Sequence, residues 1–172
     1  MTRNFNIHKG SDMSKETKST PADSDEIFSL LKKIFEELMP FDRLLGVKVE
    51  NLGFDDICVR VDMKAEFVGN FVKGILHGGV ISSVLDLTGG LIAYVGVIKR
   101  MQEQSLDEIM SRFTRMGTID LRVDYLRAGK GKYFLTRGSI LRIGNKVAVV
   151  RTEFKNDESV LIAAGTGTYL VG

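Results

Sequence analysis

Residues 78–98 read GGVISSVLDLTGGLIAYVGVI, and this stretch decides the fold. The helix that it predicts has apolar side chains on every face, so it either crosses a membrane or lies inside its own protein. Asp86 in its middle, with Ser82, Ser83 and Thr88 beside it, favours the protein interior. A lone Asp at the centre of a bilayer costs about 3 kcal/mol to insert. We therefore expect a buried helix and no membrane span.

Strand patterns lie on both sides of this helix. Six segments have the alternation or the composition of strands: 47–50, 57–63, 119–125, 134–143, 146–156 and 160–171. Gly144-Asn145, between two of them, is a two-residue hairpin signal. The pattern predicts an α+β fold in which an antiparallel sheet wraps the buried helix.

A further helix is predicted before the first strand. Apolar residues recur at helical spacing from Ile27 to Leu38, and Asp23 and Glu26 can form a capping box in front of them. Pro40 is expected to stop this helix.

An added helix is predicted within about 99–117, where Ser105 and Glu108 form a second possible capping box. The residues expected to face inward are Leu106, Ile109, Met110 and Phe113. Those expected to face water are Gln104, Asp107, Ser111 and Arg112.

Length, composition and charge narrow the function classes. The chain has 172 residues, enough for one well-buried domain, which we place at 23–172. Residues 1–22 are polar and aperiodic, so a disordered tail without a signal-peptide pattern is expected there, and the cytoplasm is the expected location. A net charge of +2 is too small to indicate a nucleic-acid partner by itself, and we expect none. Cys58, the single cysteine, rules out a disulfide framework and a cysteine-based metal cluster and fits a reducing compartment.

Chemistry concentrates in residues 70–79, NFVKGILHGG, and in Asp86. Gly78 and Gly79 at a helix start leave backbone N–H groups free and unobstructed, which suits an anion or a polarised carbonyl oxygen. Asp86 lies further along the same apolar helix, where an unpaired carboxylate is costly unless it is solvated or used. A glycine pair, a lone His or a buried Asp is each often structural, but their conjunction indicates a functional site.

This string resembles the Asn…His-Gly-Gly…Asp signature of hotdog thioesterases of the phenylacetate-degradation (PaaI-like) type, over about 45–172. The resemblance implies that Asp86 activates water or attacks the thioester carbonyl. It implies that Gly78 donates its backbone N–H to that carbonyl, that Asn70 orients the loop, and that His77 supports the site. The spacing of His77 and Asp86 matches the family, whereas Asn70 to His77 is one residue longer than usual.

Further substrate contacts follow from the same resemblance. Thr118 stands where some relatives carry a hydroxyl that holds the water, although strand propensity explains a Thr there equally well. Arg127, Lys130 and Lys132 lie where relatives often bind the CoA phosphates, and a solvated turn is the alternative. Gly79 is expected to contact substrate through its backbone.

The resemblance implies an enzyme that hydrolyses a fatty or aryl acyl-CoA without a cofactor or a metal. It also implies that a homodimer is the minimum unit, with a homotetramer expected, since the site is built across the interface. Two alternatives remain open: a non-catalytic acyl-CoA binding or sensing module, and a hotdog hydratase or dehydratase. Residues 99–117 either cap the acyl tunnel or pack only as architecture.

Overall fold

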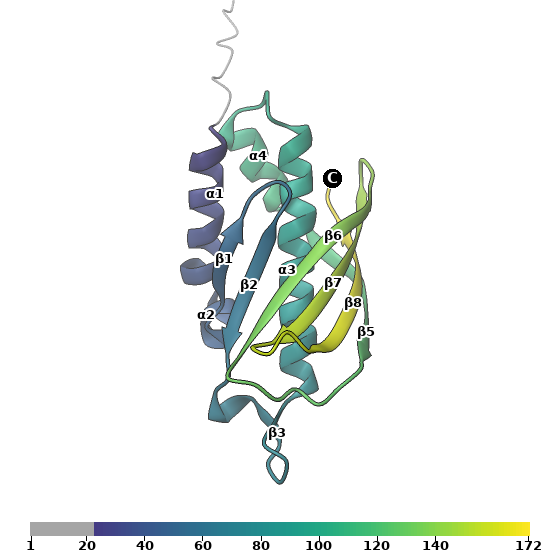
Figure 1. Cartoon of the computed structure of the whole chain (residues 1–172). Helices are drawn as coiled ribbons and strands as arrows, with labels where there is room; N and C mark the ends of the chain where they lie inside the picture. Colours follow the sequence, from purple (N-terminus) through teal and green to yellow (C-terminus); the bar gives the residue numbers. More distant parts are fainter. Residues whose placement is uncertain (1–22) are drawn as a thin grey trace, which may run out of the picture.

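One antiparallel sheet dominates the computed structural model, which describes residues 23–172 (Figure 1). Within that range six strands run in the order β1-β2-β6-β7-β8-β5. Their bounds are β1 Lys48–Leu52, β2 Ile57–Asp62, β5 Gly117–Tyr125, β6 Tyr133–Ile143, β7 Val147–Asn156 and β8 Leu161–Leu170. Each corresponds to a predicted segment. The tail predicted at 1–22 lies outside the described residues.

The helix α3, Gly78–Arg100, packs along the inner face of this sheet against β6, β7 and β8 (Figure 1). On β7 every second side chain from Ala148 to Asn156 is buried, as one-sided burial against α3 requires. By length and composition α3 could cross a membrane, but 67% of its most apolar window is buried within the protein. It is therefore the core helix, as predicted.

The N-terminal helical segment is divided into three parts. Helix α1, Ser24–Lys33, continues into a π-helical turn, η1, Ile34–Leu38, and a short helix, α2, Pro40–Leu45, follows. Asp23 caps α1 by accepting the Asp25 N–H at 3.2 Å, whereas neither bond of the predicted Asp23–Glu26 capping box is found within the described residues. Pro40 ends the first helix as expected, but it also opens α2, which the sequence did not predict. Proline is well suited to a first helical position because its missing N–H has no partner there.

Helix α4, Leu106–Phe113, confirms the helix expected within 99–117, and its Ser105–Glu108 capping box is complete. It docks on α3 through Tyr94, whose hydroxyl donates to the Ile109 carbonyl at 2.6 Å. The Phe113 ring meets the Tyr94 ring edge-on, with centroids 5.0 Å apart. Between β2 and α3 the chain forms the 3-10 turn η2, Ala65–Phe67, and then a small hairpin. The two strands of this hairpin are β3, Val68–Asn70, and β4, Ile75–Leu76.

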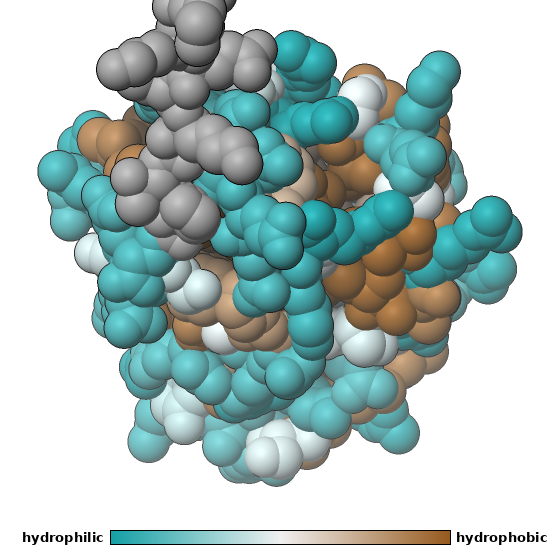
Figure 2. All heavy atoms as spheres, turned by 90° about the horizontal axis from the view of Figure 1, so that it is seen from above, coloured by the Kyte–Doolittle hydropathy of each residue, from teal (hydrophilic) through white to brown (hydrophobic). Residues whose placement is uncertain are grey.

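Figure 2 looks down on the end of the molecule that carries α4 and the β6–β7 hairpin. Hydrophilic side chains cover most of this face, and hydrophobic side chains gather on one side of it. Exposed apolar residues near this hairpin and strand end include Leu141, Val147 and Leu170.

Candidate active site

The start of α3 is held in place by His77, its N-cap residue. Its Nδ1 accepts the Gly79 N–H at 2.8 Å, and its own N–H donates to the Phe67 carbonyl at 2.8 Å. Because Nδ1 is an acceptor, the neutral ring carries its proton on Nε2. The Gly79 N–H, which we expected to contact substrate, is therefore occupied by His77.

The Gly78 N–H has no hydrogen-bond acceptor within the described residues. It belongs to the first turn of α3, where N–H groups lack a carbonyl partner in the helix and the positive end of the helix dipole lies behind them. The Gly78 carbonyl accepts the Tyr125 hydroxyl from β5 at 3.1 Å, which fixes the peptide from the sheet side. This N–H is a ready donor for a carbonyl oxygen or an oxyanion.

Asp86 lies farther along α3 and is half-buried. Thr118 at the start of β5 donates its hydroxyl to Asp86 Oδ1 at 2.9 Å. Tyr169 on β8 donates to the Asp86 backbone carbonyl at 3.1 Å, and burial followed by the Asp86 charge raises the pKa of Tyr169. The tyrosine therefore remains a hydroxyl donor. Gly89 on α3 permits this approach, since a Cβ there would collide with the Tyr169 ring.

Asp86 opens into a cavity of about 410 Å³. Its apolar wall is formed by aromatic, methionine and leucine side chains from η1, the Met39 junction, α2, α3, α4 and the α4–β5 connection: Phe35, Met39, Phe41, Leu87, Phe113 and Met116. The polar side chains are Asp42, Ser83, Asp86, Thr118 and Tyr169. A mostly apolar cavity with a few convergent polar groups is typical of a small-molecule site.

Asp42, in the first turn of α2, is a site residue that the sequence reasoning missed. It is only 2% exposed, and burial raises the pKa of its carboxyl to about 6. The sequence around it, Met39-Pro40-Phe41-Asp42, carries one signal, since an acid shortly after a proline indicates a helix start. That signal predicts a solvated acid at a helix end, and its burial becomes visible only in the packed structure.

Asn70 lies at the tip of the β3–β4 hairpin and is exposed. Its Oδ1 accepts the Val72 and Lys73 N–H groups, each at 3.1 Å, so the side chain shapes its own turn. Within the described residues no hydrogen bond joins Asn70 to His77. Its predicted role in orienting the histidine loop stays a prediction.

The predicted phosphate cations lie on the connection between β5 and β6, and all three are exposed. Arg127 donates to the Leu161 carbonyl at 3.1 Å, which anchors its guanidinium to the first residue of β8. The Leu76 N–H donates to the Gly129 carbonyl at 2.9 Å, so this connection is tied to β4 one residue before His77. Lys130 and Lys132 therefore belong to a loop attached to the helix start.

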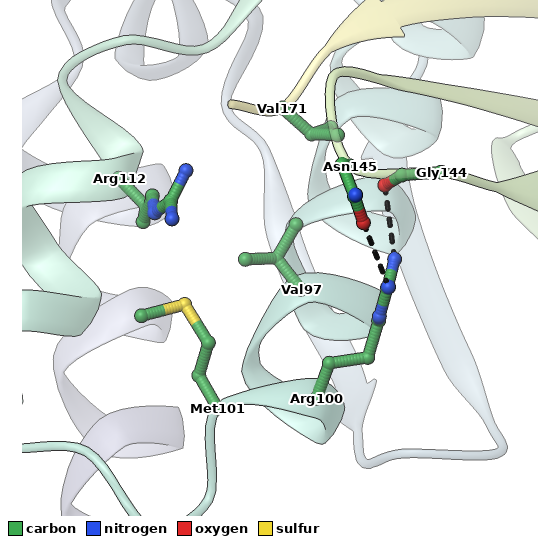
Figure 3. A pocket seen from close by; sticks show the side chains of 7 residues that line it. All are labelled: Val97, Arg100, Met101, Arg112, Gly144, Asn145 and Val171. Carbon is green, nitrogen blue, oxygen red and sulfur yellow. Dashed lines mark hydrogen bonds between the residues drawn. The ribbon is translucent and has the colours of Figure 1, made fainter.

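A second cavity, of about 220 Å³, lies at the far end of α3 (Figure 3). Arg100 crosses to the β6–β7 hairpin and donates to the Gly144 carbonyl at 2.9 Å and to Asn145 Oδ1 at 3.2 Å (Figure 3). Arg100 is 14 residues beyond Asp86, about 21 Å along a helix. The described lining contains neither a carboxyl side chain nor a nucleophile. This cavity lies between the β6–β7 hairpin and the end of α3 and is separate from the candidate active site.

The residues described, 23–172, contain no group of three or more His, Cys, Asp or Glu side chains arranged to hold a metal ion. The groups described above are the carboxyls of Asp42 and Asp86, the hydroxyls of the cavity and the N-terminus of α3.

A sheet wrapped around one long helix that opens on His-Gly-Gly and carries a carboxylate at its middle is the hotdog architecture of thioesterases. Residues 73–163 match the Thioesterase superfamily. The chain is 44% identical over 149 residues to an Escherichia coli protein named medium/long-chain acyl-CoA thioesterase YigI, covering 87% of this chain and 96% of that protein. A Salmonella typhimurium protein of the same name is 43% identical over the same length and coverage.

The solved structures agree. A crystal structure of a Shewanella oneidensis protein, described as related to the thioesterase superfamily, superposes with a TM-score of 0.83 at 42% identity. The match covers 86% of this chain and 97% of that one. The chain belongs to the Thioesterase superfamily, and by class it is a thioesterase.

Proposed function

We propose that the chain hydrolyses medium- to long-chain fatty acyl-CoA to free acid and CoA. The observation that carries the proposal is the Asp86 carboxylate in the lining of a mostly apolar cavity of about 410 Å³. The names of the relatives at 44% and 43% identity support a fatty acyl chain over an aryl group. An apolar wall with flexible methionines suits chains of several lengths.

Asp86 would act by one of two routes. As a general base it takes a proton from water, whose oxygen attacks the thioester carbonyl and expels the CoA thiolate. As a nucleophile it attacks the carbonyl itself and expels the CoA thiolate, and water then cleaves the resulting anhydride to release the free acid and restore the Asp86 carboxylate. In both routes Thr118, hydrogen-bonded to Asp86 Oδ1, would hold the carboxylate or the water in position.

The oxyanion would be stabilised by the Gly78 N–H and the positive end of α3. His77 supports this donor because its ring fixes the next peptide through the Gly79 N–H. Asn70 would contribute by shaping the hairpin that precedes His77. Lys130, Lys132 and Arg127 would attract the CoA phosphates on the same side of the helix start, to which their loop is attached.

One chain does not bring these parts to a single carbonyl. Gly78 and Asp86 are eight residues apart on one helix, which corresponds to about 12 Å. A thioester carbonyl is only a few ångströms across, so we propose that Asp86 of one subunit works with Gly78 of another. β5 is the last strand of the sheet, and its open outer edge, with exposed Ile119 and Tyr125 on the strand, supports a homodimer as the minimum unit.

Three finer points belong to the same proposal. The Asn…His-Gly-Gly…Asp string supports membership of the phenylacetate-degradation (PaaI-like) type. A homotetramer, as two dimers, is the expected assembly, in keeping with the symmetry common among soluble oligomers. The cytoplasm is the proposed location, supported by Cys58, a single buried thiol.

Asp86→Asn tests the function. We expect release of free CoA from dodecanoyl-CoA to fall at least ~100-fold, the scale of losing a general base, while fold and assembly are retained. Asp55→Asn is the matched control, because Asp55 is an exposed acid paired with Lys99 outside the site. Near-normal hydrolysis by Asp86→Asn would reject this mechanism, and absence of wild-type hydrolysis across acyl chain lengths and aryl-CoAs would reject the function.

A further inference from the structure

The cavity beside Asp86 contains a second carboxyl group whose hydrogen-bonding capacity is unused. Asp42 is 2% exposed, and its Oδ2 is buried without a hydrogen-bond partner among the described residues. Within residues 23–172 no basic side chain forms an ion pair with it. A buried polar atom left unsatisfied costs about 1–3 kcal/mol, so a site that retains one needs an explanation.

The protein offers Asp42 no donor from the other polar side chains of this cavity. The Ser83 hydroxyl donates to the Gly79 carbonyl at 2.7 Å. The Thr118 and Tyr169 hydroxyls donate to Asp86, one to its side chain and one to its backbone carbonyl. All three hydroxyl protons are therefore committed elsewhere, and the remaining polar group is the Asp86 carboxyl.

Most of the remaining cavity wall is apolar, with Met39, Phe41 and Phe35 contributed by the same N-terminal segment as Asp42 and Phe113 by α4. A plain hydrocarbon chain in this cavity would shield Asp42 from water without giving it a hydrogen bond. A chain that carries a hydroxyl would satisfy it. A cationic amine would lose its own hydration on entering an apolar cavity, so the neutral donor fits better.

We propose that Asp42 is a specificity-determining residue that accepts a hydrogen bond from a hydroxyl group on the acyl chain of the substrate. The cavity thereby selects hydroxylated fatty acyl thioesters over unsubstituted chains of equal length. This inference rests on the proposed function, since it places the acyl chain in the cavity beside Asp86. It assigns Asp42 a contact with substrate that leaves the Asp86 chemistry unchanged.

The experiment compares dodecanoyl-CoA with hydroxydodecanoyl-CoA isomers that carry the hydroxyl at successive carbons. The wild type is expected to prefer at least one isomer by roughly 10-fold or more in kcat/KM, because a site built for a hydroxyl rejects the analogue that lacks it. Asp42→Leu should abolish this preference and raise kcat/KM for dodecanoyl-CoA. Asp42→Asn should keep part of it, since the amide oxygen still accepts a hydrogen bond.

Asp107→Leu is the control, because Asp107 is an exposed acid in the first turn of α4 and does not line the cavity. If Asp42→Leu does not fold, Asp42→Ala provides the same comparison. An identical ranking of isomers in the wild type and in the Leu or Ala variant overturns the proposal. So does a wild type that hydrolyses all isomers and dodecanoyl-CoA equally, an outcome that leaves the thioesterase function standing.

Calorimetric binding of the same intact thioesters to Asp86→Asn separates the two proposals. One outcome is that a hydroxydodecanoyl-CoA isomer binds with a lower Kd than dodecanoyl-CoA, that this difference is lost when Asp42 is also replaced, and that the wild type hydrolyses none of the thioesters. This outcome would reject the thioesterase function and support the hydroxyl-binding site. Equal Kd values for dodecanoyl-CoA and every isomer would count against the site.

Discussion

Asp42 and Asp86 line the same cavity in different surroundings. Asp86 receives a hydroxyl hydrogen bond and is partly open, whereas Asp42 is buried with no donor to its Oδ2. Desolvation favours the neutral form of a carboxyl, which is why burial raises the pKa of Asp42 to about 6.

The raised pKa of Asp42 predicts how stability changes with pH. The folded protein holds this proton more tightly than the unfolded chain, in which the carboxyl has its ordinary value of 3.8. Its contribution is therefore fully present below about pH 4 and is lost as the pH rises through about 6, by roughly 3 kcal/mol. Asp42→Asn should remove that loss, so its free energy of unfolding, measured in denaturant, should gain on the wild type between pH 4 and pH 7.

Asp56 and Asp62 act in the opposite sense, because hydrogen bonds from Arg137 and Lys48, respectively, lower their pKa values. Their contributions are lost as the pH falls, and they are common to the wild type and the variant. Parallel stability curves for the wild type and Asp42→Asn would mean that Asp42 is solvated in solution.

The sequence predicted Asp86 and its neighbour Thr118, and the structure brings them within hydrogen-bond distance. Asp86 could be recognised from the sequence alone because it is a charged residue within an otherwise apolar helix. Asp42 was not, because it stands in a short helix among exposed residues, and its burial results from packing of η1 and α2 near α3. A polar residue buried by tertiary contacts alone leaves no local pattern.

At the scale of elements, the connection from β5 to β6 carries the proposed phosphate contacts. Replacing Arg127, Lys130 and Lys132 together with Ala should raise KM for acyl-CoA, leave kcat nearly unchanged and weaken the salt dependence of binding. The Lys130 and Lys132 double variant is the cleaner comparison, because Arg127 also anchors the strand at Leu161. An unchanged KM in both variants would mean that this loop is a solvated turn that does not contact the CoA phosphates.

Helix α4 provides a second prediction. Phe113 lines the cavity. Met110 is not part of the lining, and its sulfur lies 3.9 Å from the Tyr94 hydroxyl. Phe113→Ala should change the ranking of chain lengths, by roughly 1–3 kcal/mol in relative kcat/KM. Met110→Ala, the matched control, should lower thermal stability and keep the ranking. If both variants lose stability and neither alters the ranking, α4 has only an architectural role.

Long elements were predictable because each repeats its pattern over several turns or residues. The six sheet strands and α3 have such repeats, and α4 has a complete capping box. The short helix α2, the π-helical turn η1 and the β3–β4 hairpin were not predicted. Each is too short for periodicity to distinguish it from a loop, and tertiary contacts decide its conformation.

Gly78 and Asp86 lie about 12 Å apart on one helix, and this separation is the reason for proposing that two chains build one site. In a two-fold dimer, each site would combine Asp86 of one subunit with the Gly78 N–H of the other. Each subunit would thus contribute to both sites. A heterodimer of two different inactive variants can therefore contain one intact site.

Gly78→Pro removes the proposed oxyanion donor with little effect on the helix. Gly78 is the first residue of α3, where proline is tolerated because its missing N–H has no helical partner. His77, with φ −67° and ψ 136°, already has the extended backbone that a following proline requires. We expect this variant and Asp86→Asn each to form inactive homodimers; a Cβ at Gly78 would lie 3.3 Å from the Tyr125 ring, which must shift slightly to accept it.

Unfolding and refolding an equal mixture of Gly78→Pro and Asp86→Asn tests the shared site. Half of the random dimers are heterodimers, and each would contain one site with both wild-type groups, so about a quarter of wild-type activity should return. If both groups acted within one chain, every site in the heterodimer would carry one defect and no activity would return. The control is a mixture of the wild type with a variant that carries both substitutions in one chain. If the sites are shared, each site of its heterodimers has one defect and the heterodimers are inactive. If each site lies within one chain, the wild-type subunit of the heterodimer stays fully active.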